Sequence, residues 1–309
     1  MRRLSTAALA GLTALGLAAC STAGGATGDH VTSTGDPGAC PGDVVHVVVS
    51  VSQWSDLART LGGNCAAVTT VLTSSAVDPH DFEPAPSDIA AFTGADVVLV
   101  NGAGYDSWAT RAVENLTPRP AVLTVADLAG TTGGNPHLWY SPAAVEKVAA
   151  AVTAELAKRS PHAERYFAEQ SRAWTADLQP YLDEIAALRD AAHGRTYAAT
   201  ETVFDDMAAA VGLADRTPEA YRQAVSNESE PPPGALSAFE SALAAHRVDV
   251  LVVNTQTEGK VPDRLRAAAE KAGVPVVAVT ESPPQGAGSF VAWQVEQLRA
   301  LSAALSGTR

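Results

Sequence analysis

From residue 44 to the end of the chain, short apolar runs of strand length alternate with longer amphipathic segments of helix length. Residues 96–100 are almost continuously apolar, which is typical of a strand buried on both faces. Glycine often follows the amphipathic segments, as at Gly63 and Gly212, where it would end a helix. Strands that alternate with helices pair in parallel and are covered by those helices, so the pattern predicts the α/β class.

The alternation occurs in two arrays, which a much longer helical pattern separates. We predict an N-terminal α/β lobe over residues 43–160 and a C-terminal α/β lobe over residues 195–309, each with a mainly parallel sheet. Residues 161–194 predict one long connecting helix of roughly 45 Å, which Pro180 should kink or divide. The expected strands are 44–51, 66–72, 96–100 and 121–125 in the first lobe, and 195–200, 249–253 and 274–279 in the second.

The first residues have the pattern of a targeting segment rather than that of a folded domain. Two arginines precede an apolar run that ends in Leu17-Ala18-Ala19-Cys20, which is similar to the lipobox of bacterial lipoproteins. We predict a signal peptide over residues 1–20 and a lipid on Cys20 that anchors the protein to the outer face of the cell membrane. Residues 21–42 are rich in Gly, Ser and Thr and predict a flexible tether. The alternative is an ordinary secretory signal with an incidental cysteine.

Two further cysteines, Cys40 and Cys65, form an even pair in a compartment that would be oxidising. Each lies just before an expected strand, at 44–51 and at 66–72. If these strands are parallel neighbours, both cysteines lie at the same edge of the sheet and can form a disulfide. Two free thiols or a metal site are the alternatives.

The chain is acidic, with a formal net charge of −13 over 309 residues. This charge argues against nucleic acid as a partner and is compatible with attracting cations. Hydrophobic residues make up 46% of the chain and charged residues 18%, as in a globular protein.

Four polar residues follow expected strands, two in each array: His80, His137, Glu201 and Glu281. Ligands of open α/β sheets bind beyond the carboxyl ends of the strands, so these side chains converge in the cleft if the two arrays face each other. Two imidazoles and two carboxylates, without a thiolate, suit one divalent transition ion. Simpler interpretations exist for each: the carboxylates could cap the helices that follow, and the histidines could be hydrogen-bonded loop residues.

At these residues the chain resembles the metal-binding solute-binding proteins of ABC importers, the zinc and manganese family called cluster A-I. The resemblance covers nearly the whole mature chain. It rests on residues 78–84, Asn101-Gly102, residues 135–139, Thr200-Glu201 before a Phe-containing helix, and residues 280–282. It implies that His80, His137, Glu201 and Glu281 are the metal ligands, in a cleft between two lobes joined by one long helix. It also implies an ABC permease in the membrane as the partner.

The chain departs from many zinc importers of this family. Glu201 stands where they have a third histidine, Glu281 stands where they have an aspartate, and loop 130–134 lacks a His-rich insertion. The carboxylate at position 201 is similar to the manganese-type members, and harder oxygen donors favour Mn²⁺ or Fe²⁺. Intrinsic affinity still favours Zn²⁺, so the ligand set leaves the choice among the three ions open.

The resemblance implies a lipid-anchored receptor, expected to be a monomer, that captures a divalent metal ion and delivers it to a permease. We expect it not to be an enzyme. A metallohydrolase would need an open position for water and a general base, and no further motif accompanies the four candidates. A receptor for an organic ligand would need an aromatic or cationic cleft, which an aromatic content of 6% does not favour. A metal chaperone or adhesin with the same site is the remaining alternative.

Overall fold

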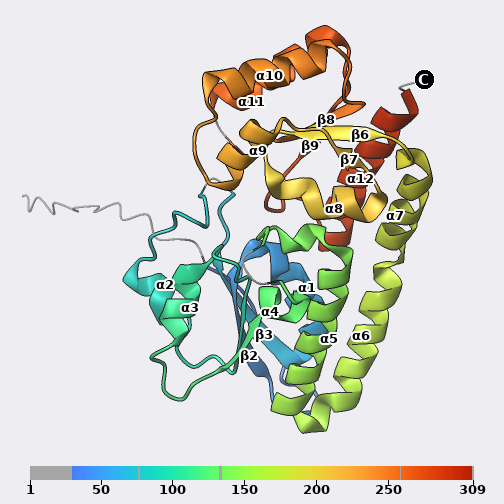
Figure 1. Ribbon diagram of the computed structural model, residues 1–309. Helices are drawn as coiled ribbons and strands as arrows, with labels where there is room; N and C mark the ends of the chain where they lie inside the picture. The colour runs from blue at the N-terminus through green and yellow to red at the C-terminus, as the bar shows by residue number, and fades with distance from the viewer. Residues whose placement is uncertain (1–29, 76, 132–133, 258, 308–309) are drawn as a thin grey trace, which may run out of the picture.

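The computed structural model describes residues 30–75, 77–131, 134–257 and 259–307. It has two α/β lobes, one above the other in Figure 1, with long helices along one side of both. The signal peptide with Cys20, and residues 21–29 of the expected tether, lie outside the described residues. Within those ranges, every helix is too short or too polar to cross a bilayer.

The first sheet has five strands in the order β1-β3-β2-β4-β5. All neighbours are parallel except β1, which pairs antiparallel with β3. The central strand β2 is almost purely valine, and all but one of its residues are buried, as in a parallel strand covered on both faces. The strands are β1 Val31–Ser33, β2 Val45–Val51, β3 Ala66–Leu72, β4 Val97–Val100 and β5 Ala121–Thr124.

The strand β1 lies within residues 21–42, which the sequence predicts to be a flexible tether, so the structure differs from that expectation. Residues 31–33 pair with residues 68–70 of β3. The imidazole of His30 also lies 2.7 Å from Oδ1 of Asp88. The edge of β3 supplies unpaired backbone groups, and these order the segment without help from apolar side chains.

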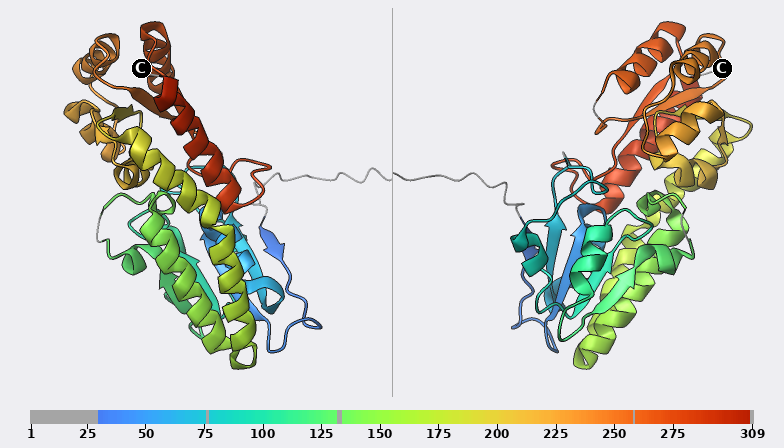
Figure 2. Two further views of the ribbon diagram at one scale, coloured as in Figure 1. Left: turned by 90° about the vertical axis from the view of Figure 1, so that its right-hand side faces the viewer. Right: turned by 60° about the vertical axis from the view of Figure 1, so that its left-hand side comes forward.

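Helices cover the first sheet (Figures 1 and 2). Helices α1, α5 and α6 pack against one another on one face, and α2 and α3 lie toward the other. The helical elements of this lobe are η1 Ser52–Trp54, α1 Ser55–Gly62, η2 Gly63–Cys65, α2 Pro86–Ala90, α3 Ser107–Val113, α4 Val125–Ala129, η3 Leu138–Tyr140 and α5 Pro142–Arg159.

The second sheet has four parallel strands in the order β7-β6-β8-β9. Helices α9, α10 and α11 cover one face with a small core of their own. Helix α12 packs on β9 and on α7. The elements are β6 Thr196–Ala199, η5 Thr202–Phe204, α8 Asp205–Val211, β7 Ala214–Asp215, α9 Glu219–Ser226, α10 Pro233–Ala244, β8 Val250–Asn254, α11 Lys260–Ala272, β9 Val276–Val279 and α12 Phe290–Gly307.

The connection between the lobes is helical over nearly its whole length (Figure 2, left). It consists of η4 Pro161–Ala163, α6 Glu164–Asp177 and α7 Gln179–Ala192, with a break at Leu178. Pro180 lies in the first turn of α7, where its missing N–H is tolerated. The expected boundary near Pro180 is therefore confirmed.

The two lobes share one apolar core, because the larger cluster of buried residues contains side chains from both sheets. Tyr140 of the first lobe packs against side chains of the second lobe, with ring centroids 5.3 Å from Phe204 and 6.1 Å from Trp293. Its hydroxyl lies 2.8 Å from the carbonyl oxygen of Thr280 and 2.7 Å from Oε1 of Gln297. This packing restrains the lobes against a wide swing.

A disulfide joins Cys40 to Cys65, whose Cα atoms are 5.0 Å apart. The two cysteines precede β2 and β3, which are parallel neighbours in the sheet. The bond thus ties the segment before β2 to the end of η2, at the sheet edge away from the cleft.

Candidate metal-binding site

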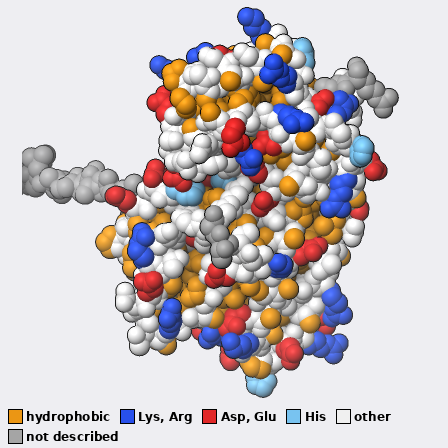
Figure 3. All heavy atoms as spheres, viewed as in Figure 1, with side chains coloured by type: hydrophobic (Ala, Val, Ile, Leu, Met, Phe, Trp, Pro, Cys, Tyr) orange, Lys and Arg blue, Asp and Glu red, His pale blue; other side chains and the backbone are white. Residues whose placement is uncertain are grey.

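A cavity of about 1030 Å³ between the lobes is lined by all four candidate ligands. His80 follows β3, His137 precedes η3, and Glu201 and Glu281 come two residues after β6 and β9. Acidic side chains and a histidine border the hollow in the space-filling view (Figure 3). The cavity therefore collects strand-end residues from both sheets, as the topology requires.

His137 is held with one ring nitrogen free. Its Nδ1 lies 2.6 Å from Oδ1 of Asn135, an atom that only accepts hydrogen bonds, so Nδ1 carries the hydrogen. The opposite nitrogen, Nε2, is 3.9 Å from Oε1 of Glu281. Burial, and then the charge of His80, lower the pKa of His137 to about 3. The imidazole is therefore neutral and presents a lone pair to the cavity, as a metal ligand must.

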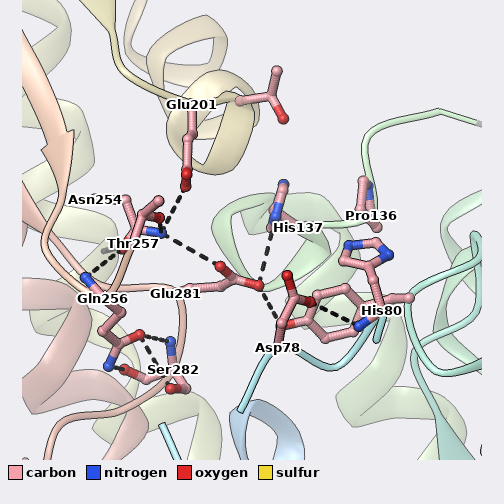
Figure 4. A network of polar contacts seen from close by, with 12 residues as sticks. Asp78, His80, Pro136, His137, Glu201, Asn254, Gln256, Thr257, Glu281 and Ser282 are labelled. Carbon is pink, nitrogen blue, oxygen red and sulfur yellow. Dashed lines mark hydrogen bonds and ion pairs between the residues drawn. The ribbon is translucent and has the colours of Figure 1, made fainter. Parts of the chain in front are cut away.

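Glu281 is the central carboxylate of the cavity (Figure 4). The hydroxyl of Tyr105 donates to its Oε1 at 2.7 Å. Gln53 in turn donates to the Tyr105 hydroxyl at 2.8 Å and to the carbonyl oxygen of Glu281 at 3.2 Å. Burial, followed by the charges of Glu201 and Asp78, raises the pKa of Glu281 to about 7, although the Tyr105 hydrogen bond opposes this.

Glu201 approaches from the opposite wall of the cavity, and Asn254 lies between it and Glu281 (Figure 4). Nδ2 of Asn254 is 2.7 Å from Oε2 of Glu201 and 3.4 Å from Oε2 of Glu281. Burial raises the pKa of Glu201, against hydrogen bonds from Thr257 and Asn254. Two carboxylates of raised pKa side by side form a site that a cation would stabilise.

His80 stands apart from the other three candidates. Its Nδ1 lies 3.4 Å from Oε1 of Glu228, on the loop after α9 in the second lobe. Its ring packs edge-on against Tyr105, with centroids 4.8 Å apart. Its backbone N–H donates to Oδ1 of Asp78 at 2.8 Å, which fixes the turn that carries it.

Polar contacts connect three of the candidates, whereas His80 contacts Glu228 of the other lobe. His137 faces Glu281, and Asn254 links Glu281 to Glu201. Among the described residues, no group of three or more His, Cys, Asp or Glu side chains is close enough to ligate one ion. The four candidates share one cavity without forming a complete coordination shell.

Three residues of the site were not among the sequence candidates: Asp78, Tyr105 and Asn254. Asp78 is the first residue of the segment 78–84 that carries His80, and its charge raises the pKa values of both glutamates. Asn254 could have been found, because it is the first polar residue after the apolar run Val250–Val253 and so occupies a strand end. Tyr105 carries no such signal, since a buried tyrosine is equally typical of a core.

Comparison with known proteins places this chain in a family. The sequence profile of the family described as "Zinc-uptake complex component A periplasmic" matches residues 47–304. This chain belongs to that family. The high-affinity zinc uptake system protein ZnuA of Bacillus subtilis is 25% identical to this chain over 244 residues. The aligned part covers 72% of this chain and 75% of ZnuA. The metal ABC transporter substrate-binding lipoprotein SloC of Streptococcus mutans is 25% identical over 297 residues, covering 90% of this chain and 89% of SloC.

Solved structures share the fold of this chain. The periplasmic zinc binding protein TroA from Treponema pallidum superposes with a TM-score of 0.70 at 19% identity, covering 85% of this chain and 99% of TroA. FpvC from Pseudomonas aeruginosa, in complex with Mn²⁺, gives a TM-score of 0.70 at 19% identity, covering 86% of this chain and all of FpvC (100%). These likenesses establish the two-lobed architecture.

Proposed function

We propose that this chain is the extracytoplasmic receptor of an ABC importer, which binds one divalent transition ion and delivers it to a membrane permease. Membership of the zinc-uptake component family supports this proposal. The observation that carries it is that two histidines and two glutamates from four separate loops line one interlobe cavity.

The proposed ligands are His80, His137, Glu201 and Glu281. His137 already offers a neutral nitrogen, and the raised pKa values of the two glutamates indicate carboxylates that lack a cationic partner. A divalent ion would supply that partner and displace any proton that Glu281 holds. Zn²⁺, Mn²⁺ and Fe²⁺ all accept nitrogen and carboxylate donors, so each is a candidate cargo.

Binding requires His80 to approach the other three ligands, and its Nδ1 can keep Glu228 as a partner while Nε2 binds the ion. The shared core around Tyr140 restrains the lobes, so we expect closure by local movement of loops 77–85 and 227–232 rather than by a wide hinge swing. An ion that bridges the loops of both lobes would provide the differential affinity that such a shift needs.

We also propose that lipidation of Cys20 tethers the receptor to the membrane surface near its permease, and that the receptor acts as a monomer. Its family is named for a component of an uptake complex, and transport rather than catalysis is the proposed role.

Thermal unfolding of chelator-treated protein, with and without added Zn²⁺ or Mn²⁺, tests this function. A ligand at a hundredfold excess over Kd should stabilise the fold by about 2.7 kcal/mol. For a chain of this size, that corresponds to a rise of several degrees in melting temperature. The same melting temperature with and without both ions would overturn the proposed function.

A further inference from the structure

Helices α8, α9, α10 and α11 end in the same backbone turn, in which the residue just beyond the helix has a positive φ. Its N–H bonds to the carbonyl oxygen three residues earlier, and the next N–H bonds to the carbonyl oxygen five residues earlier. Glycine suits this position, and Gly212 and Gly273 occupy it after α8 and α11. After α9 the position holds Glu228, with φ of 52°, and after α10 it holds His246, with φ of 48°.

The side chain of Glu228 reaches from its turn to the first lobe. Its Oε1 lies 3.4 Å from Nδ1 of His80, and α9 lies on the side of the second lobe that faces the first (Figure 1). The hydroxyl of Ser229 donates to the carbonyl oxygen of Ala224 at 2.9 Å and fixes the turn further. Glu228 is 66% exposed, and an exposed ion pair contributes little to stability. The turn therefore holds a carboxylate beside a candidate ligand of the other lobe, at little gain to the fold.

This contact determines how His80 meets an ion. A carboxylate only accepts hydrogen bonds, so a neutral imidazole bonded to it carries its hydrogen on Nδ1 and keeps a lone pair on Nε2. His137 has the same arrangement, with its Nδ1 beside Oδ1 of Asn135 in its own loop. The ring of His80 also packs edge-on against Tyr105, whose hydroxyl donates to Glu281. His80 is thus separated from the central carboxylate by one tyrosine.

We propose that Glu228 is a positioning residue for metal binding, which accepts the Nδ1 hydrogen of His80 while Nε2 of His80 binds the ion. This inference rests on the proposed function. Ligating histidines commonly donate their second ring nitrogen to a carboxylate, which fixes the ring and strengthens it as a ligand. Because this carboxylate belongs to the second lobe, it couples loop 227–232 to an ion that the first lobe holds through His80.

The test is to measure Kd for Zn²⁺, by competition with chelators, in the wild type, Glu228→Met and Glu228→Gly. Methionine keeps a long unbranched side chain without the carboxylate, and glycine suits the left-handed turn. His246→Gly is the control for the backbone change, since His246 occupies the same kind of turn and is not among the described residues that line the cavity. Glu230→Met is the control for charge, since Glu230 lines the cavity from the same loop.

We expect Kd for Zn²⁺ to rise by about tenfold or more in both Glu228 variants. In His246→Gly and Glu230→Met it should stay within about threefold of the wild type, because salt screens exposed charges that do not contact the site. If one Glu228 variant fails to fold, the other gives the same comparison.

The double variant His80→Ala, Glu228→Met shows whether Glu228 acts through the imidazole. If it does, adding Glu228→Met to His80→Ala should change Kd by less than about twofold. A general attraction of cations by the Glu228 charge would persist without His80 and give the full loss again.

Wild-type affinity in the Glu228 variants, an equal loss in either control, or a full Glu228 effect without His80 would overturn the role of Glu228 and leave the proposed function standing. A wild-type protein that binds no divalent transition ion would overturn the proposed function, and this inference with it.

Discussion

The two candidate histidines both line the cavity, but their surroundings differ. His137 is buried, and an amide oxygen fixes its ring, whereas His80 lies against an exposed carboxylate of the other lobe. In the sequence both follow a proline in a loop after a strand, and nothing distinguishes them. The difference arises from which loops of the opposite lobe face them, and this depends on tertiary contacts that no local pattern encodes.

Replacing a candidate ligand should remove metal affinity and spare the fold. His80→Ala and Glu201→Ala should each weaken binding of Zn²⁺ and Mn²⁺ by about 100-fold or more, since loss of an outer partner alone costs about 10–100-fold. Titration calorimetry and circular dichroism of the apo protein would measure both properties. His46→Ala is the matched control, because His46 is exposed on β2 and far from the cavity lining. Wild-type affinity in either ligand variant would contradict the assignment.

The carboxylate of Glu281 should make the free energy of unfolding of the metal-free protein depend on pH. Its pKa is raised from 4.5 to about 7, so between these pH values the folded state holds a proton that the unfolded chain releases. This group therefore destabilises the fold as pH rises through that window. His137 acts in the opposite direction, because its pKa is lowered from 6.5 to about 3. A plot of wild-type unfolding free energy against pH would therefore combine the effects of both groups.

The variant Glu281→Gln separates the pH effect of Glu281 from that of His137, because it removes only the carboxylate. The apo variant should be more stable than the wild type at pH 8 by up to about 3 kcal/mol, and this gain should shrink toward pH 5. Urea unfolding at a series of pH values would measure the difference. A difference that does not vary with pH would show that Glu281 ionises normally.

Among the elements, the long apolar strands were the most predictable. β3 begins and ends at the predicted residues, and β2 differs by one, since runs rich in valine and threonine strongly favour strands. The sequence analysis did not identify α9 or β1. α9 has eight residues and buries only Tyr221 and Ala224, while β1 has three residues and depends on its partner strand. Such short elements are specified by their neighbours rather than by their own periodicity.

The disulfide between Cys40 and Cys65 should stabilise the first lobe. It closes a loop with a sequence separation of 25 residues, and chain entropy predicts about 3 kcal/mol for such a loop. The double variant Cys40→Ala, Cys65→Ala should lose about that amount in urea unfolding, while metal binding persists because the bond lies away from the cavity. Equal stability of the double variant and the oxidised wild type would contradict this expectation.

At the scale of the whole molecule, the sequence predicted which loops meet but not how closely. The candidates were expected to converge if the carboxyl ends of the two parallel sheets faced each other, and all four line one cavity between the lobes. The contact of His80 with Glu228 could not be predicted, because it joins two lobes through a loop whose path no motif specifies. The shared core around Tyr140 likewise depends on packing between distant segments.

The most direct measurement is a crystal structure of the zinc-loaded protein, with anomalous scattering at the zinc edge to locate the ion. The account predicts a single ion in the interlobe cavity. It should lie about 2.0–2.2 Å from one nitrogen each of His80 and His137 and from one oxygen each of Glu201 and Glu281. An ion bound elsewhere, or an ion in the cavity that leaves His80 or either glutamate unbound, would contradict it.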